Sequence, residues 1–244
     1  MWAERMEEFT IGDPFSGDAQ GRQAVFAAAA DFYRFQNFGY PRKSALEWVG
    51  NRHGLNAADR QLLHRGVFSR ERALMRLGKR CRGASWRSEP VVVDGHNVHI
   101  TLESALLGRP LVRANDGALR DTAGLSARFR VTDATEAAVA LLFHCLKAFS
   151  PREVVFLFDA PMSHSGILAA CYREALASFG IPGEARTARV PEREFPYERA
   201  VVAGSDRAVL DQARRWLDLA SLALGFARCP HVCVDFFAFL APRT

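Results

Sequence analysis

Three short apolar runs, each followed by an aspartate, constrain the fold of this chain more than any other feature. The runs and their acids are 91–93 with Asp94, 154–158 with Asp159, and 200–203 with Asp206. Continuous β-branched and aromatic runs of this length predict strands buried on both faces, as in parallel sheets. The stretches between the runs have helix-like spacing of apolar residues, so we expect a mostly parallel α/β sheet.

The carboxyl ends of parallel strands lie on one edge of a sheet, so Asp94, Asp159 and Asp206 are expected to be neighbours. Carboxylates gathered there repel one another, and burial raises the cost, so such a cluster is usually kept for a cation. Oxygen ligands favour Mg²⁺ or Mn²⁺ over zinc. These ions support phosphodiester hydrolysis, because they orient a phosphate, generate hydroxide and stabilise the leaving oxygen.

Further polar residues are candidates for the same site. Asn97 is expected to ligate the ion, to bind a metal-bound water or to fix Asp94. Asp211, on a predicted helix five residues after Asp206, is the expected fourth metal ligand, and Asp235 at the end of a last strand (232–234) competes with it. Each acid alone has a simpler explanation, which is helix capping or a surface turn, and the clearest case is Asp206 directly after Ser205.

The chain divides by charge and pattern into a polar lead-in (residues 1–21), a basic helical module (22–84) and an α/β domain (89–244). Helices are expected near 23–36, 41–54, 56–63 and 69–79. Residues 39–88 hold 12 Lys and Arg against 3 Asp and Glu, whereas residues 89–244 hold 17 against 18. In the second part, Asn115-Asp116-Gly117 predicts a hairpin between 110–113 and 118–120.

The basic excess in the helical module predicts a polyanionic partner such as nucleic acid, and a solvated arginine-rich surface is the simpler alternative. Two of the expected helices, joined through residues 53–56, resemble a helix-turn-helix in outline. The candidate phosphate contacts are Arg42, Lys43, Arg52 and Arg65 in the module, and Arg120 in the α/β domain.

Composition favours a cytoplasmic protein without a membrane segment. No apolar run approaches the roughly 20 residues of a spanning helix, and the first residues lack an apolar signal region. The chain has five cysteines, an odd number without a disulfide framework. Cys229, His231 and Cys233 suggest zinc only weakly, because no second Cys/His pair lies nearby in sequence.

Two family resemblances add to this interpretation. Val-Val-Val-Asp-Gly-His-Asn at 91–97, Phe-Leu-Phe-Asp at 156–159 and Gly-Ser-Asp-Arg-Ala-Val-Leu-Asp at 204–211 resemble the PIN-like nucleases, including a branch whose first strand ends in Asp-Gly-Tyr-Asn. That resemblance implies a metal-dependent ribonuclease with Asp94, Asp159 and Asp206 as ligands. His96 departs from the pattern, because it stands where an aromatic residue is usual, and the hairpin near Asp116 is an insertion.

The second resemblance covers roughly residues 22–220 and is to a prokaryotic family known as domain of unknown function 434, which implies no established activity. The residues that carry it are 40–45, 51–52, 108–110, 116–117, 120–121, 159–161, Ser163 and 165–166.

We therefore expect a PIN-like three-layer α/β/α domain with a mostly parallel central sheet, preceded by a small all-α module. The expected function is Mg²⁺- or Mn²⁺-dependent cleavage of RNA, which the family analogy favours over DNA as the partner. One alternative is a non-catalytic PIN-like protein that binds RNA or DNA or acts as a scaffold. Another is a DNA-binding helical module joined to a small-molecule sensor. A second copy of the chain, forming a homodimer, is a further candidate partner.

Overall fold

The computed structural model describes residues 19–122 and 132–240, which form two compact units. The sheet unit comprises the described residues of 79–107 and 124–230, and the helical unit those of 10–78, 108–123 and 231–244. Each unit is considered by itself. In the described ranges, no helix combines the length and the hydropathy needed to cross a bilayer.

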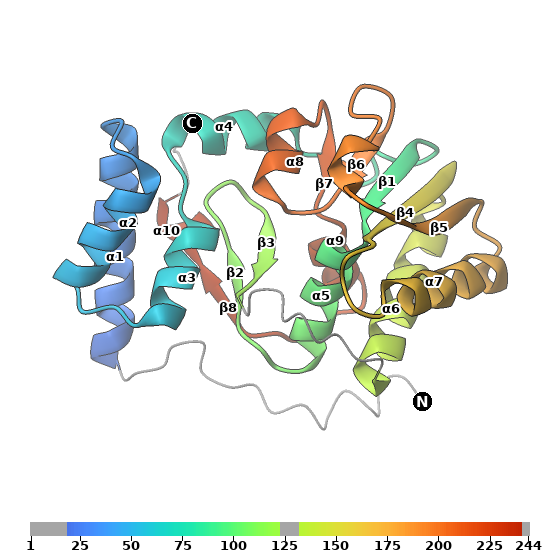
Figure 1. The fold of residues 1–244 in the computed structure, drawn as a ribbon, viewed down its shortest axis with the longest axis horizontal. Coiled ribbons are helices and arrows are strands. Elements are labelled where there is room, and N and C mark those ends of the chain that lie inside the picture. The colour runs from blue at the N-terminus through green and yellow to red at the C-terminus, as the bar shows by residue number, and fades with distance from the viewer. Residues whose placement is uncertain (1–18, 123–131, 241–244) are drawn as a thin grey trace. The chain divides into compact units, whose positions relative to one another are not determined.

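The sheet unit is built on a five-stranded sheet in which every neighbouring pair is parallel (Figure 1). The strand order is β5-β4-β1-β6-β7. The buried runs predicted at 91–94, 154–158 and 200–203 are confirmed as strands, and the pairing confirms a mostly parallel sheet. The strands are β1 (Pro90–Asp94), β4 (Glu153–Asp159), β5 (Gly183–Ala188), β6 (Val201–Ala203) and β7 (Trp216–Leu217).

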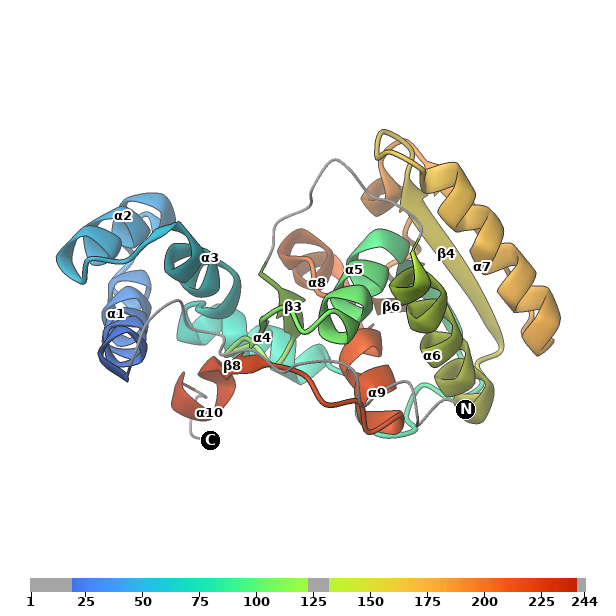
Figure 2. The ribbon, with the colours of Figure 1, turned by 90° about the horizontal axis from the view of Figure 1, so that it is seen from below.

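Helices α5 (Gly95–Leu106), α6 (Asp133–Phe149) and α7 (Ser165–Phe179) cover one face of this sheet. Tyr172 of α7 is completely buried, and its ring contacts Phe156 and Phe158 of β4, Phe143 of α6 and His99 of α5. Figure 2 shows α6 and α7 running beside β4. The unit also contains η2 (Pro191–Arg193), α8 (Arg207–Gln212) and α9 (Leu219–Phe226), and α9 packs on α5 and α6.

The strand order has a switch point between β1 and β6. From β1 the chain proceeds outward through β4 to β5, and it then returns to the other side of β1 to form β6 and β7. In open α/β sheets, ligands bind beyond the carboxyl ends of the strands at such a point, because successive connections diverge there and leave a crevice. A ligand-binding site is therefore expected at the carboxyl ends of β1 and β6.

The helical unit contains the four helices expected for the basic module and a small sheet. The hairpin predicted around Asn115-Asp116-Gly117 is confirmed, with β2 and β3 antiparallel. Leu63, Val112 and Phe236 contribute to one apolar core shared by helices and strands. The elements are α1 (Ala19–Asn37), α2 (Arg42–Arg52), α3 (Ala57–Gly66), α4 (Arg70–Lys79), β2 (Leu111–Arg113), β3 (Leu119–Asp121), β8 (Cys233–Asp235) and α10 (Phe236–Leu240).

The last strand does not join the parallel five-stranded sheet. β8 pairs with β2 in the order β3-β2-β8, so this expectation from the sequence is wrong. The reason is burial, because Val234 and Phe236 complete the apolar core of the helical unit. The hairpin and β8 thus belong with the helices of the module, whereas the sequence pattern grouped both with the α/β domain.

Candidate functional site

Three of the predicted acids follow neighbouring strands at the switch point of the sheet. Asp94 is the last residue of β1 and is paired with Leu157 of β4, so Asp159 lies two residues further along β4. On the other side, Val93 is paired with Ala203, the last residue of β6, and Asp206 comes three residues later. The prediction that these acids follow adjacent parallel strands is therefore confirmed by the topology.

Asn97 ties the end of β1 to the end of β6. Asp94 caps α5 by accepting a hydrogen bond from the backbone N–H of Asn97 at 3.2 Å. The Asn97 side-chain oxygen accepts bonds from the backbone N–H and the hydroxyl of Ser205, at 2.8 and 2.9 Å. Gly204 leaves room for this contact, since a Cβ there would lie 3.2 Å from the Asp94 Cβ. Three roles were expected for Asn97, and the structure shows the third, because its hydrogen bonds hold Asp94 and the end of β6 in place.

Asp94 is only 8% exposed. Burial, with smaller contributions from the negative charges of Asp159, Asp206 and Glu192, raises the pKa of this carboxyl to about 7 against the lowering effect of the hydrogen bond from Asn97. A carboxyl that titrates near neutral pH beside other acids is typical of a functional site. A divalent cation among these groups would remove the repulsion that raises the pKa.

His96, which like Asn97 lies on α5, holds the end of β4 in place. Its Nδ1 accepts a hydrogen bond from the backbone N–H of Asp159 at 2.9 Å, so the ring proton lies on Nε2. Nδ1 is also 3.7 Å from a carboxylate oxygen of Asp159, but an imidazole that accepts at Nδ1 is neutral, so this is no charged pair. The histidine found in place of an aromatic residue thus orients the Asp159 backbone while its ring packs against Phe158.

Asp206 has a structural role that the sequence also indicated. It is the N-cap of α8, where one carboxylate oxygen accepts bonds from the backbone N–H groups of Ala208 and Val209, at 2.7 and 3.3 Å. Both Asp206 and Asp159 are half-buried. Asp206 still contributes negative charge to the surroundings of Asp94, so capping and participation in the acidic cluster coexist.

The sequence did not single out Glu192 and Tyr197, which belong to the same cluster. Glu192 lies in η2, just after β5, and Tyr197 donates a hydrogen bond to the Glu192 backbone oxygen at 2.9 Å. Burial, followed by the charges of Glu192, Asp206 and Asp94, raises the pKa of Tyr197 to about 12. The rule that found the aspartates could have found Glu192, because η2 follows the carboxyl end of the next parallel strand.

The proposed fourth acids have other surroundings. Asp235 caps α10 by accepting from the Ala238 N–H at 2.9 Å, and its strand belongs to the small sheet of the helical unit. Asp211 is half-buried on α8, where its backbone oxygen accepts a bond from Lys79. Within residues 19–122 and 132–240, no group of three or more His, Cys, Asp or Glu side chains is arranged to hold a metal ion, and this includes Cys229, His231 and Cys233.

The five predicted phosphate contacts fall into two classes. Lys43 and Arg52 are exposed on α2. Arg65 lies 3.3 Å from Asp121, and Arg42 donates to the backbone oxygens of Val67 and His64. Arg120 is buried and bound to Asp116, so the structure gives it an internal partner in place of a phosphate. Only the first two present their charge mainly to solvent.

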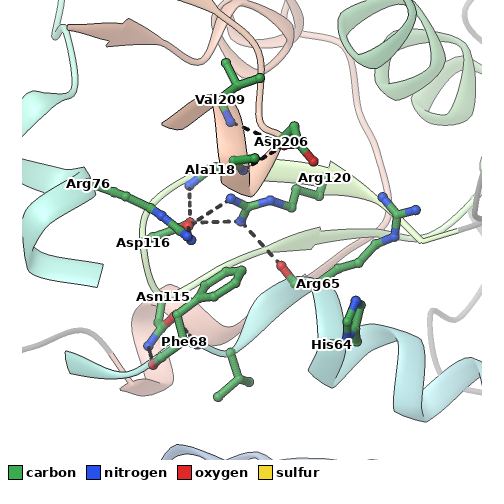
Figure 3. A network of polar contacts seen from close by, with 12 residues as sticks. His64, Arg65, Phe68, Arg76, Asn115, Asp116, Ala118, Arg120, Asp206 and Val209 are labelled. Atoms are coloured by element: carbon green, nitrogen blue, oxygen red, sulfur yellow. Dashed lines mark hydrogen bonds and ion pairs between the residues drawn. The ribbon is translucent and has the colours of Figure 1, made fainter. Parts of the chain in front are cut away.

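Asp116 is the centre of a buried ion network in the helical unit (Figure 3). Its two carboxylate oxygens accept bonds from Arg120 at 2.9 and 2.8 Å and from Arg76 at 2.8 Å, and the Ala118 N–H donates to one of them. Both guanidinium groups lie over the ring of Phe68. Burial alone would raise the pKa of Asp116, but the two arginines outweigh it and hold the pKa below its ordinary value. This network joins α4 to the β2–β3 hairpin.

Both parts of the chain match described protein families. Residues 24–79 match the family "Protein of unknown function (DUF434)", which confirms that resemblance for the helical module. Residues 84–222 match a different family, so the single resemblance expected over 22–220 corresponds to two. An uncharacterized protein of Methanocaldococcus jannaschii is 29% identical over 207 residues, which cover 84% of this chain and 99% of the relative. No solved structure matches the chain. Because the match to residues 84–222 spans more than half of the sequence, the chain belongs to the family "Domain of unknown function (DUF5616)".

Proposed function

We propose that the acidic edge of the sheet unit is a divalent-cation-dependent phosphodiesterase site and that its substrate is RNA. The observation that carries this proposal is Asp94, a buried carboxyl at the switch point whose pKa is raised to about 7 by burial and by Asp159, Asp206 and Glu192. Acids held together at such a place destabilise the fold unless they serve a ligand, and the ligand that suits them is a cation.

The donor set suits Mg²⁺ or Mn²⁺, because it consists of carboxylate oxygens without a thiolate or an accessible imidazole. Asp94 would be a ligand together with Asp159 and Asp206 from the neighbouring strand ends, and the three side chains would have to close around the ion, because the described residues hold no preformed group of this kind. When bound, the ion supplies a hydroxide nucleophile and stabilises the leaving oxygen. Asn97 and His96 keep the ends of β6 and β4 against Asp94, so they position the acids and do not react themselves.

The choice of RNA rests on the resemblance to PIN-like nucleases and on the basic charge of the helical unit. That the sheet unit is a PIN-like, three-layer domain is part of the same proposal. Lys43 and Arg52 are the exposed side chains among the predicted phosphate contacts, so they are the ones expected to affect RNA affinity.

A cleavage assay with total RNA and Mn²⁺ tests the proposal. We expect EDTA-sensitive cleavage that falls by more than about 100-fold in Asp94→Ala, because even the groups that support metal ligands contribute about 10–100-fold. Asp94→Asn should lose activity equally while keeping the cap of α5. Glu184→Ala is the matched control, since this exposed acid lies near the opposite end of β5. Equal trace activity in the wild type and Asp94→Ala would refute catalysis at this site.

A second candidate is a non-catalytic RNA-binding protein with the same fold. Two observations favour it: one oxygen of Asp206 is occupied by capping α8, and the described residues contain no preformed group of three metal-ligating side chains. Asp206→Asn and Asp206→Ser separate the two functions, because both residues preserve an N-cap but remove the charge. The enzyme predicts that both variants lose cleavage and keep their stability. The binder predicts RNA binding without cleavage in every variant, including the wild type.

A further inference from the structure

The helical unit carries a cluster of exposed aromatic rings that the proposed site does not use. We define the aromatic patch as Phe38, Tyr40 and Trp48, whose exposed fractions are 76%, 46% and 51%. The first two lie in the turn between α1 and α2, and Trp48 lies on α2. Single exposed apolar side chains are ordinary, but Tyr40 and Trp48 are exposed rings in contact with each other, with Phe38 two residues before Tyr40 in the same turn, and such a group indicates a binding surface.

The rings of Tyr40 and Trp48 both pack against Phe35 of α1. The Phe35 ring centroid lies 5.3 Å from that of Tyr40 and 6.3 Å from that of Trp48, and Tyr40 and Trp48 are 6.0 Å apart. All three contacts are edge-to-face, at interplanar angles of 75–77°. The turn itself is fixed, because Gly39 adopts a φ of 84° and the Tyr40 N–H bonds to the Phe35 oxygen at 3.0 Å. Rings fixed in this way lose little conformational entropy when a ligand stacks on them.

The charges around the patch indicate what the ligand is. Residues 31–52 contain four basic residues and two acids, Asp31 and Glu47, and one of the basic residues, Arg42, is bonded to backbone oxygens inside the unit. Arg52 lies one helical turn after Trp48, on the same side of α2, and its side chain is 76% exposed although it is 3.9 Å from Asp31. Lys43 at the start of α2 is also exposed. Protein-binding surfaces are depleted of lysine around their aromatic residues. Exposed rings interleaved with basic side chains are typical of surfaces that bind single-stranded nucleic acid.

We propose that the aromatic patch stacks on unpaired bases of a single-stranded nucleic acid, while Lys43 and Arg52 contact its phosphates. Stacking suits any base, because every base has a π face, so the surface would bind single strands with little sequence preference. This inference rests on the proposed function only in taking the strand to be RNA. It requires neither a cation nor cleavage.

Binding of a fluorescein-labelled oligouridine of about 12 nucleotides, measured on the full chain in EDTA, tests the patch. We expect Trp48→Ala to weaken binding about tenfold (~1.4 kcal/mol), whereas Trp48→Phe stays close to the wild type because it keeps a ring. An abasic oligomer of equal length and charge should bind weakly and equally to the wild type and Trp48→Ala. Arg52→Ala should reduce the slope of log affinity against log salt by about 0.7.

Tryptophan fluorescence gives an independent measure of stacking. Trp86 and Trp216 are completely buried, so in a Trp2→Phe background the exposed Trp48 is the residue that a base can quench. Quenching by oligouridine that disappears in Trp48→Phe supports the proposal. Unchanged oligouridine affinity in Trp48→Ala overturns it, and if that variant also converts a dimer to a monomer, the patch is a self-association surface.

The outcome is separable from that of the proposed function. Oligouridine binding is measured in EDTA, so it reports on the patch without the cation that cleavage requires. A chain that binds through Trp48 but cleaves nothing keeps this inference and removes the phosphodiesterase. If the wild type cleaves RNA but Trp48→Ala binds oligouridine with unchanged affinity, the phosphodiesterase is kept and this inference is removed.

Discussion

Asp94→Asn is expected to make the folded chain more stable at pH 8, by at most about 4 kcal/mol. The gain arises because the wild-type carboxylate is buried beside Asp159, Asp206 and Glu192, and its ionisation in the folded state is therefore costly. Asparagine carries no charge and retains an oxygen for the N–H of Asn97, so the cap of α5 survives. Most substitutions of a buried polar residue destabilise a protein, so an increase here would be diagnostic.

The effect should depend on pH in a defined direction. The pKa of Asp94 is raised from 3.8 to about 7 on folding, so between these values the folded chain holds a proton that the unfolded chain has lost. The wild type therefore loses stability as the pH rises through this window, and the cost is complete above pH 7. The difference between Asp94→Asn and the wild type should be at most about 4 kcal/mol at pH 8, and at pH 5 it should be less than half of its value at pH 8.

Urea unfolding at both pH values, with and without Mn²⁺, measures this effect and its relation to the cation. An ion that binds the folded chain stabilises it by about 2.7 kcal/mol at 100 times its Kd. That gain should appear in the wild type at pH 8, shrink at pH 5 and be absent in Asp94→Asn. Equal stability of the two proteins at pH 8 would show that the carboxylate is not strained by its neighbours. A Mn²⁺ gain that persists in the variant would place the ion elsewhere.

Asp116→Ala is expected to destabilise the helical unit by about 3–5 kcal/mol, the range found when one partner of a buried ion pair is removed. The change leaves the guanidinium groups of Arg76 and Arg120 buried without the carboxylate that binds them. It also removes the acceptor of the Ala118 N–H in the hairpin. The pKa of Asp116 is lowered, so this contribution is retained at neutral pH and is lost only as the pH falls through that lowered value.

Chemical denaturation of Asp116→Ala and of Asp31→Ala at pH 7 gives the comparison. Asp31 pairs with the largely exposed Arg34 and Arg52 and with the half-buried His53 at 2.9 Å, and its removal leaves no fully buried charge, so its loss should cost about 1–2 kcal/mol. Asp116→Asn keeps the size of the side chain but not its charge, and it should fall between the two. If Asp116→Ala costs no more than Asp31→Ala, the buried network does not hold α4 to the hairpin.

Local sequence determined most of the secondary structure. The apolar runs before Asp94 and Asp159 are strands because β-branched and aromatic residues suit a sheet buried on both faces. The helix expected near 56–63 forms as α3, and the Asn56 side chain caps it by accepting a bond from the Asp59 N–H. These signals depend on neighbours in the chain, so they can be read without knowing the fold. The position of the acids on one edge followed, because parallel strands place their carboxyl ends together.

Tertiary structure decided which of these residues act together. A three-residue strand such as β8 fits either sheet by pattern, and its place beside β2 was decided by the core that Val234 and Phe236 complete. Arginine is a residue type that commonly contacts phosphates, but Arg120 is buried and forms an ion pair with Asp116. The pKa of Asp94 and the presence of Glu192 beside it likewise depend on distance through space and on burial. Sequence thus determined the elements and the edge where the acids lie, whereas packing determined their charge and partners, because electrostatic energy depends on through-space distance and on exclusion of water.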